Sequence, residues 1–472
     1  MDERNLTAQI NSSYNEQTDE LALLKARSLK ESLPPDTWLV CWNSFLWGLG
    51  NTLVSTMLIV YIVFGLVDRS RFSWLFLTTA ILTASPRILG VMRAFAPKML
   101  GGKRSMAQKA AGYLTLSGLT LSLIPFLVQL EGLVSVTALI IGLILLWAIH
   151  HLNQYIGTIA LNCWIGGHVP DCVRGQFYAA KNRYELAGAI TASAVAFSLR
   201  GVHLPITPYM FWAWTGAAII ILSNIPLLFC SREPGDCDSA SDPDKNQTSN
   251  SKLDKPSTAP SIFSPLHFKT FCLFLLYGIA FSFVNGLTQT SQYQYSIHGL
   301  NISYEFSLLL LAISRLGQWI TTWFIGRWSD QALRLTMMIS QFIVAVGLFC
   351  LGAANENFYY VPIYLGWICW SGYAGLNVGI PKYLHRLSIE NGNRPATFSL
   401  YYAVGGIAFS VSLILSGAVL DFLSFSFDLE SISIYGIQFF AAVLIVGAFL
   451  RLLLVPMLGF AVESNKEKNG RR

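Results

Sequence analysis

The feature that most constrains this chain is a series of twelve apolar segments, each long enough to cross a lipid bilayer. A spanning helix needs about 20 mostly apolar residues, because the hydrocarbon core is about 30 Å thick and a helix rises about 1.5 Å per residue. The segments cover residues 38–66, 72–96, 108–130, 133–161, 184–204, 208–231, 267–297, 304–326, 333–354, 357–380, 397–423 and 432–457. Lipid offers no hydrogen-bond partner to free backbone groups, so these segments are predicted to be helices.

Composition supports a membrane protein rather than a large soluble domain. The chain is 53% hydrophobic and only 12% charged, whereas a soluble domain carries about 25% charged residues. Its Lys and Arg residues are dispersed along the chain and do not gather on one face, so we expect no nucleic-acid partner. Lipid is the expected environment and partner.

A polar segment at residues 232–264 divides the apolar sequence into two halves. It contains four Lys or Arg, six Asp or Glu, four Pro and seven Ser. Such a segment cannot bury enough apolar surface to offset the entropy of ordering it. We therefore predict an N-terminal tail at 1–37, a six-helix bundle at 38–231, a linker at 232–264, a second six-helix bundle at 265–457 and a C-terminal tail at 458–472.

The charges between the predicted spans indicate the orientation. One set of loops holds twelve basic residues: Lys98, Lys103, Arg104, Lys109, Arg174, Lys181, Arg183, Arg327, Arg334, Lys382, Arg386 and Arg394. The opposite set holds Arg69, Arg71 and Arg200. Because basic loops stay in the cytoplasm, both termini and the linker are predicted to be cytoplasmic. We expect an integral protein of a bacterial inner (plasma) membrane.

Short sequence echoes suggest that the two halves are repeats. Ser85-Pro86-Arg87-Ile88-Leu89-Gly90 in the second span is similar to Ser314-Arg315-Leu316-Gly317 in the eighth. Duplicated halves are typical of transporters, because a site at mid-membrane can then be exposed alternately to each side. The predicted fold class is an all-α polytopic membrane protein, with 12 transmembrane helices in two pseudo-symmetric six-helix bundles.

The most specific motif lies between the eighth and ninth spans, at Gly326-Arg327-Trp328-Ser329-Asp330-Gln331-Ala332-Leu333-Arg334. Together with the six-plus-six topology it resembles the Gly-x-x-x-Asp-(Arg/Lys)-x-x-Arg signature of the major facilitator superfamily. The resemblance implies that Asp330 and the nearby arginines form a cytoplasmic charge latch that stabilises the outward-open state.

The sequence departs from that signature in two places. Gln331 stands where a basic residue is usual, and the corresponding stretch of the first half, 97–104, has no Asp. The gate residues that the motif contributes are Gly326, Asp330 and Arg334. The alternative is that these charges only solvate a tight cytoplasmic turn.

Polar and aromatic side chains form stripes at helical spacing in spans 1, 4, 7 and 10. The predicted substrate-binding residues on these stripes are Asn43, Trp47, Asn51, His150, His151, Gln154, Asn285, Gln289, Gln292, Trp370, Tyr373 and Asn377. In the family that the chain resembles, these four helices line the central cavity. Amide and aromatic groups favour an uncharged polar solute such as a sugar or glycoside. The alternative is that the amides join neighbouring helices.

Two arginines lie deep inside corresponding spans of the two halves, Arg87 and Arg315. They could clamp an organic anion from opposite sides. Alternatively, they act as gate residues that pair with helix ends or carboxylates where the halves meet. The sequence leaves both interpretations open.

The leading hypothesis is a secondary transporter that moves a small polar organic solute by alternating access. A coupling proton, with His150 and His151 as candidate carriers, or a sodium ion is left open, as is transport without coupling. We expect no cofactor and no metal, since the eight Cys show no ligand spacing. An enzyme is not expected, because no His/Asp/Glu cluster lies at one membrane face. A sensor or assembly factor with a transporter-like fold is the remaining alternative.

Overall fold

The computed structural model describes most of the apolar sequence. The described residues are 36–54, 75–101, 104–130, 133–198, 208–230, 263–295, 300, 304–354, 360–391, 393–426 and 429–462. Almost all of the predicted N-terminal tail and linker lie outside them, as do Lys103, Arg69, Arg71 and Arg200.

The regular elements that the structure describes are helices, in the order that the apolar segments predict. Those of the N-terminal half are α3 (Thr37–Leu53), α5 (Leu75–Leu89), η1 (Gly90–Phe95), α6 (Ala96–Met99), α7 (Met106–Val128), α8 (Val136–His168), α9 (Asp171–Ser198), α10 (Pro208–Ser223) and η2 (Pro226–Phe229). Those of the C-terminal half are η3 (Ser264–His267), α11 (Lys269–Gln294), α12 (Tyr304–Gln331), α13 (Leu333–Gly352), α14 (Tyr360–Cys369), η5 (Trp370–Gly372), α15 (Tyr373–Asn391), α16 (Arg394–Ser426) and α17 (Leu429–Ala461). The predicted all-α polytopic fold is confirmed.

Among the described residues, seven helices are long and apolar enough to cross a membrane. Of the other predicted spans, the first is described over only the 17 residues of α3, and the rest are interrupted or more polar. The tenth is divided by η5 into α14 and α15, and the second passes through Pro86 into the 3₁₀ turn η1. Pro lacks a backbone N–H, so it weakens regular helix at that point.

Several helices extend beyond the spans predicted from hydropathy. Helix α9 begins at Asp171 rather than at residue 184, and α15 continues through Pro381 to Asn391. The predicted loop residues Arg174 and Lys181 therefore lie on a helix. Hydropathy marks the part of a helix that faces lipid, whereas backbone hydrogen bonds continue wherever the chain stays helical.

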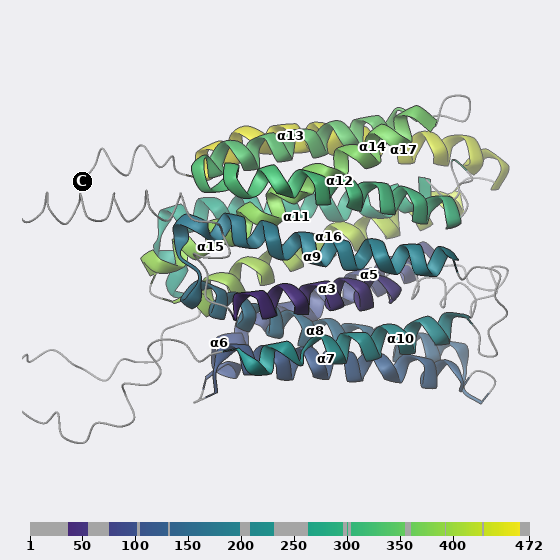
Figure 1. The fold of residues 1–472 in the computed structure, drawn as a ribbon. Coiled ribbons are helices and arrows are strands. Elements are labelled where there is room, and N and C mark those ends of the chain that lie inside the picture. The colour runs from purple at the N-terminus through teal and green to yellow at the C-terminus, as the bar shows by residue number, and fades with distance from the viewer. Residues whose placement is uncertain are drawn as a thin grey trace, which may run out of the picture.

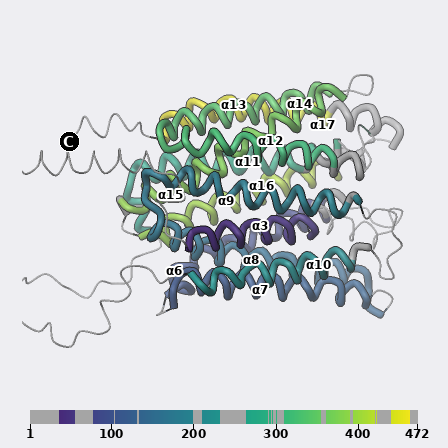
Figure 2. The backbone as a smooth tube through the Cα atoms, viewed as in Figure 1, coloured from purple at the N-terminus to yellow at the C-terminus, as the bar shows by residue number. Residues whose placement is uncertain are grey.

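The helices run side by side along one axis, with the N-terminal half on one side and the C-terminal half on the other (Figures 1 and 2). Within the first half, α3 and α9 pack so closely that a Cβ on Gly48 or Gly188 would overlap the backbone of the other helix. Small residues are what allow membrane helices to approach in this way. The halves meet where α9 contacts α12 and where α5 contacts α16.

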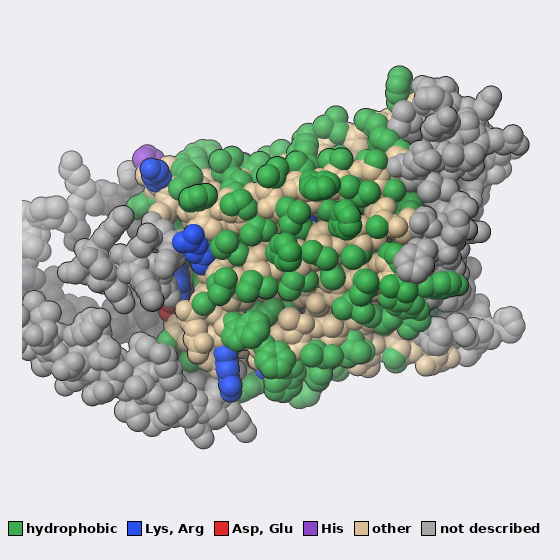
Figure 3. Space-filling model, turned by 90° about the horizontal axis from the view of Figure 1, so that it is seen from above, with side chains coloured by type: hydrophobic (Ala, Val, Ile, Leu, Met, Phe, Trp, Pro, Cys, Tyr) green, Lys and Arg blue, Asp and Glu red, His purple; other side chains and the backbone are tan. Residues whose placement is uncertain are grey.

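The outer surface is suited to lipid. On α12 the side chains of Leu316, Ile320, Trp323 and Phe324 are all about half exposed and lie on one helical face. Figure 3 shows hydrophobic side chains across the visible face, with Lys and Arg near one end of the bundle. We call this the basic end; α9 begins there and α12 ends there. The charge pattern predicts that it is cytoplasmic.

Candidate functional site

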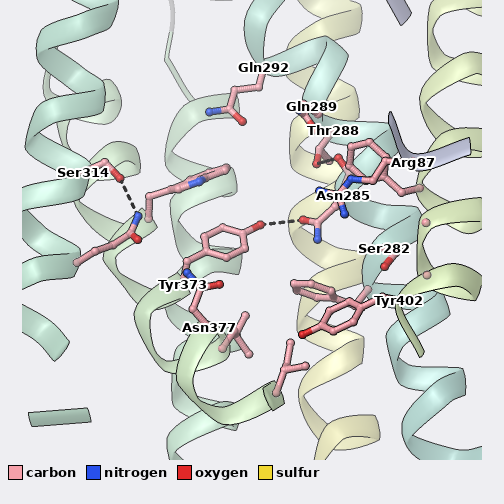
Figure 4. A pocket seen from close by; sticks show the side chains of 18 of the residues that line it. Arg87, Ser282, Asn285, Thr288, Gln289, Gln292, Ser314, Tyr373, Asn377 and Tyr402 are labelled. Atoms are coloured by element: carbon pink, nitrogen blue, oxygen red, sulfur yellow. Dashed lines mark hydrogen bonds between the residues drawn. The ribbon is translucent and has the colours of Figure 1, made fainter. Parts of the chain in front are cut away.

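A cavity of about 540 Å³ lies where the two halves meet. Its walls come mainly from α11, α12, α14, α15 and α16 of the C-terminal half (Figure 4). The N-terminal half contributes Arg87 of α5 and Leu186 of α9. The predicted site residues that line it are Asn285, Gln289, Gln292, Trp370, Tyr373, Asn377, Arg87 and Arg315.

The cavity has further polar and aromatic walls that the sequence analysis did not select. These residues are Phe281, Ser282, Thr288, Ser314, Gln318, Trp367, Tyr401, Tyr402 and Phe409. Several of them lie one helical turn from a predicted residue, as Ser282 and Thr288 lie on either side of Asn285, so a wider stripe would have included them.

The two arginines predicted from the repeat occupy the wall of the same cavity. The Arg87 guanidinium lies 4.7 Å from the centre of the Phe409 ring, a favourable cation–π arrangement. Arg315 Nη1 donates to Thr52 Oγ1 of α3 at 2.6 Å, which joins the two halves. The described lining contains no Asp or Glu, so the cavity wall is positively charged.

One edge of the cavity is held by a network that includes a residue missed in the sequence. Tyr373 Oη donates to Asn285 Oδ1 at 2.7 Å, and Arg451 Nη2 of α17 donates to the same oxygen and to Tyr373 Oη. Arg451 is only 1% exposed. The available signal was a single Arg inside the apolar segment 432–457, which is unusual for a residue that faces lipid.

The predicted substrate-binding residues of the N-terminal half, on the stripes of spans 1 and 4, are not among those that line this cavity. Asn43 donates from Nδ2 to the carbonyl oxygen of Ser223 at 2.8 Å and so ties α3 to α10. His150 is 1% exposed and its Nδ1 lies 2.8 Å from Ser117 Oγ on α7. Asn43 and His150 therefore each bond to a neighbouring helix, the arrangement that the sequence left open as the alternative.

The remaining members of these two stripes also lie away from the cavity lining. Trp47 is packed into the main hydrophobic core, which residues of both halves form. His151 makes an edge contact with the Trp147 ring at 4.4 Å between centroids. Asn51 and Gln154 are partly buried outside the lining.

At the basic end the motif residue Asp330 joins the two halves. Its carboxylate accepts hydrogen bonds from the backbone N–H of Gly175 at 2.8 Å and of Gln176 at 3.0 Å, both on α9. The fully buried Lys382 of α15 forms an ion pair with the same carboxylate. We call these four residues the Asp330 latch.

The glycines of this region allow the latch to form. A Cβ on Gly326 would lie 2.8 Å from Ala179 Cβ of α9, closer than carbon atoms can approach. A Cβ on Gly175 would overlap Ser329 Oγ and the Asp330 carboxylate. The third motif residue, Arg334, lies beside Gly459 of α17 instead of at the latch.

Burial opposes the charge on both partners of the latch. It raises the pKa of Asp330, while Lys382 and the two backbone N–H groups act in the opposite direction. It also lowers the pKa of Lys382, against the attraction of Asp330. Desolvation therefore exceeds the attraction at this pair.

Two more contacts join the halves near the Asp330 latch. Arg386 Nε of α15 donates to Asp171 Oδ2 of α9 at 3.2 Å. Tyr178 Oη lies 2.7 Å from His385 Nε2 and donates to Asn162 Oδ1 at 3.1 Å. Burial lowers the pKa of His385 well below its ordinary value, which favours the neutral imidazole. Because the Tyr178 hydroxyl donates to Asn162, the matching His385 tautomer carries its hydrogen on Nε2 and donates to the tyrosine oxygen.

A contact far from the basic end was also missed in the sequence. The Asp421 carboxylate of α16 is 1% exposed and accepts from the backbone N–H of Leu77 on α5 at 2.7 Å. Leu77 lies in the first turn of α5, where backbone N–H groups lack helical partners. A lone Asp near the end of the eleventh apolar segment was the available signal.

Sequence comparison does not place the chain, whereas comparison of structures does. No family model matches the sequence, and no curated protein matches it. The chain is similar to FucP, the E. coli fucose:proton symporter, solved in an outward conformation, with 13% identity, 91% of this chain and 99% of that chain covered, and a TM-score of 0.60.

Two further solved structures show the same likeness. One is the E. coli proton:xylose symporter XylE, with 12% identity, coverage of 89% of this chain and 94% of that chain, and a TM-score of 0.62. The other is the human organic anion transporter MFSD10, with 12% identity, coverage of 90% and 100%, and a TM-score of 0.60. The chain therefore has the fold of the major facilitator superfamily, as the motif and topology predicted.

Proposed function

We propose that this protein is a secondary transporter that moves a small polar organic solute across a membrane by alternating access. The observation that carries the proposal is the cavity between the halves, whose wall includes Arg87 of α5 and Arg315 of α12. A volume of about 540 Å³ falls within the range of about 300–1,000 Å³ that is typical of small-molecule sites.

The contacts between the halves support the same mechanism. The Asp330 latch closes the interface at the basic end through hydrogen bonds to α9. Rocking of one half against the other would break these bonds and open the cavity toward that side, which the charge pattern predicts to be cytoplasmic. Transport of sugars by FucP and XylE, and of organic anions by MFSD10, agrees with a small organic solute.

The test is solute uptake into proteoliposomes that contain the purified full-length chain. A panel of labelled sugars, nucleosides and organic anions would be measured with and without proton and sodium gradients, so that coupling is determined in the same experiment. We expect uptake of at least one solute, and its loss in Gln289→Leu, because this amide lines the cavity.

The matched control is Gln108→Leu, since Gln108 lies in the first turn of α7 and outside the cavity lining. Uptake by this variant should equal that of the natural chain. Absence of uptake for the whole panel by folded protein, or equal uptake by both Gln→Leu variants, would contradict the proposal.

A further inference from the structure

Arg451 is a buried cation beside the cavity, and the described residues offer it no anionic partner. It lies on α17 with 1% of its surface exposed. No ion pair joins it to a described carboxylate, and its Nε and Nη1 atoms lack hydrogen-bond partners there. The aromatic rings of Phe281 and Tyr373 lie 5.2 and 5.4 Å from its guanidinium carbon. A charge so placed is costly in a membrane and indicates a functional role.

The chemistry of the guanidinium fixes how Asn285 is oriented. Arginine carries only hydrogen-bond donors, so the asparagine must turn its carbonyl oxygen toward Arg451. That oxygen also accepts from Tyr373 Oη, and two donors fill its two lone pairs. The Nδ2 group of Asn285 is left for the cavity that this residue lines. Figure 4 shows the amide oxygen of Asn285 turned toward Tyr373.

The charged groups of the cavity wall also favour a substrate that accepts hydrogen bonds. Arg87 and Arg315 also present donors only, and no described lining residue is an Asp or Glu. No described carboxylate pairs with Arg87, so an anion in the cavity would supply a counterion that a neutral solute cannot. Flat apolar surface is available next to these donors on Phe281, Trp370 and Phe409.

We propose that the cavity selects aromatic carboxylates, and that Arg451 is a positioning residue that locks the Asn285 amide with its N–H groups toward the substrate. The inference rests on the proposed function, because it names the substrate class of the same cavity. A clamp formed by Arg87 and Arg315 alone would place selectivity in the cavity lining. Here Arg451, which is not part of that lining, contributes to selectivity by orienting Asn285.

The test measures binding by thermal stabilisation of the purified full-length protein. The probes are benzoate, 4-hydroxybenzoate, nicotinate and indole-3-acetate, each beside its own uncharged primary amide. We expect at least one acid to bind about tenfold or more tightly than its amide, the effect of one charged hydrogen bond. Equal binding of each acid and its amide, or no binding of any acid, would overturn the assigned substrate class.

Variants separate positioning from a merely structural role. In Arg451→Gln the new amide can donate or accept, so it no longer fixes the orientation of Asn285. The ratio of the affinity for each acid to the affinity for its amide should then fall by about tenfold. Arg451→Lys keeps a donor-only cation and should retain the ratio. The control Arg104→Gln removes an exposed charge two residues before α7 and should leave this ratio unchanged. An unchanged ratio in Arg451→Gln would refute the role of Arg451.

Asn285→Asp tests the same inference without removing the arginine. The new carboxylate would pair with Arg451, so the melting temperature should hold or rise, while acids should bind about tenfold or more weakly because a negative oxygen faces them. Undiminished acid binding by this variant would overturn the proposal. Binding is measured without transport, so the two proposals can fail separately. Uptake limited to neutral solutes would refute only the assignment of aromatic carboxylates. Binding of acids without uptake of any solute would refute only the proposed transport function.

Discussion

The Asp330 latch provides a quantitative test of how the basic end is held closed. On opening, the carboxylate would lose two hydrogen bonds from α9, those from the N–H groups of Gly175 and Gln176. Hydrogen bonds to a charged group contribute about 1.5–3 kcal/mol each, and a neutral one about 0.5–1.5 kcal/mol. In Asp330→Asn the amide can accept at most one of the two, so the closed state should lose about 2–5 kcal/mol. The ratio of open to closed molecules should rise between about 30-fold and several thousandfold.

A neighbouring carboxylate serves as the matched control for this change. Asp171 also joins the halves, through Arg386 at 3.2 Å, but its side chain is 41% exposed. Exposed ion pairs contribute at most about 1 kcal/mol. Asp171→Asn should therefore raise the open-to-closed ratio by no more than about fivefold.

The two ratios can be measured by electron–electron double resonance between spin labels on opposite halves. Labels at Arg104 and Gln331 suit this purpose, because both residues are exposed near the basic end. The accessible native cysteines would be replaced by serine in all variants. A smaller shift toward long distances in Asp330→Asn than in Asp171→Asn would refute the reasoning that burial makes the Asp330 latch the stronger contact.

Three further predictions concern the two latch charges, the glycine Gly326 and the buried His150. Replacing both latch charges, in Asp330→Asn with Lys382→Met, should open the basic end less than Asp330→Asn alone, because burial opposes charge on both groups; the same spin-label ratio checks this. Gly326→Val should weaken the closed state by about 1–3 kcal/mol through overpacking, which an unchanged ratio would contradict. His150→Leu should leave the solute affinity and pH dependence of uptake unchanged, while thermal unfolding shows a loss of about 1–3 kcal/mol from the unpaired Ser117.

The sequence predicted the helices well because their signal is local. Length and hydropathy of each apolar segment are sufficient to indicate a spanning helix. The ends were less accurate, since α9 and α15 continue as helices into sequence that carries charges. Hydropathy indicates which residues of a helix face lipid. The backbone hydrogen bonds of a helix can continue past the membrane surface, so hydropathy does not locate the helix ends.

The polar stripes show what periodicity can and cannot predict. Asn43 and Asn285 were selected by the same spacing rule, yet Asn43 bonds to α10 and Asn285 lines the cavity. Spacing identifies which face of a helix is polar. Whether that face meets another helix or a cavity depends on the neighbour, which only the packed structure reveals.

Arg451 illustrates a second limit. It lies six residues before the predicted end of the last span, where a long basic side chain commonly reaches back to the membrane surface. The structure instead turns it inward, to Asn285 and Tyr373. The direction of one side chain on a helix of mostly apolar residues is set by tertiary packing, which a single sequence does not encode in any local pattern.

The unequal contribution of the two halves to the cavity bears on how a substrate could drive the rocking motion. Most of the wall belongs to the C-terminal half, and the charged group that the N-terminal half adds is Arg87. A ligand shifts a conformational equilibrium only through a difference in its affinity for the two states. A neutral solute held by the C-terminal half alone would bind much the same in both states. An anion that bridges Arg87 and the donors of α11 and α12 would favour the state in which they lie close, so its charge would supply the difference that alternating access requires.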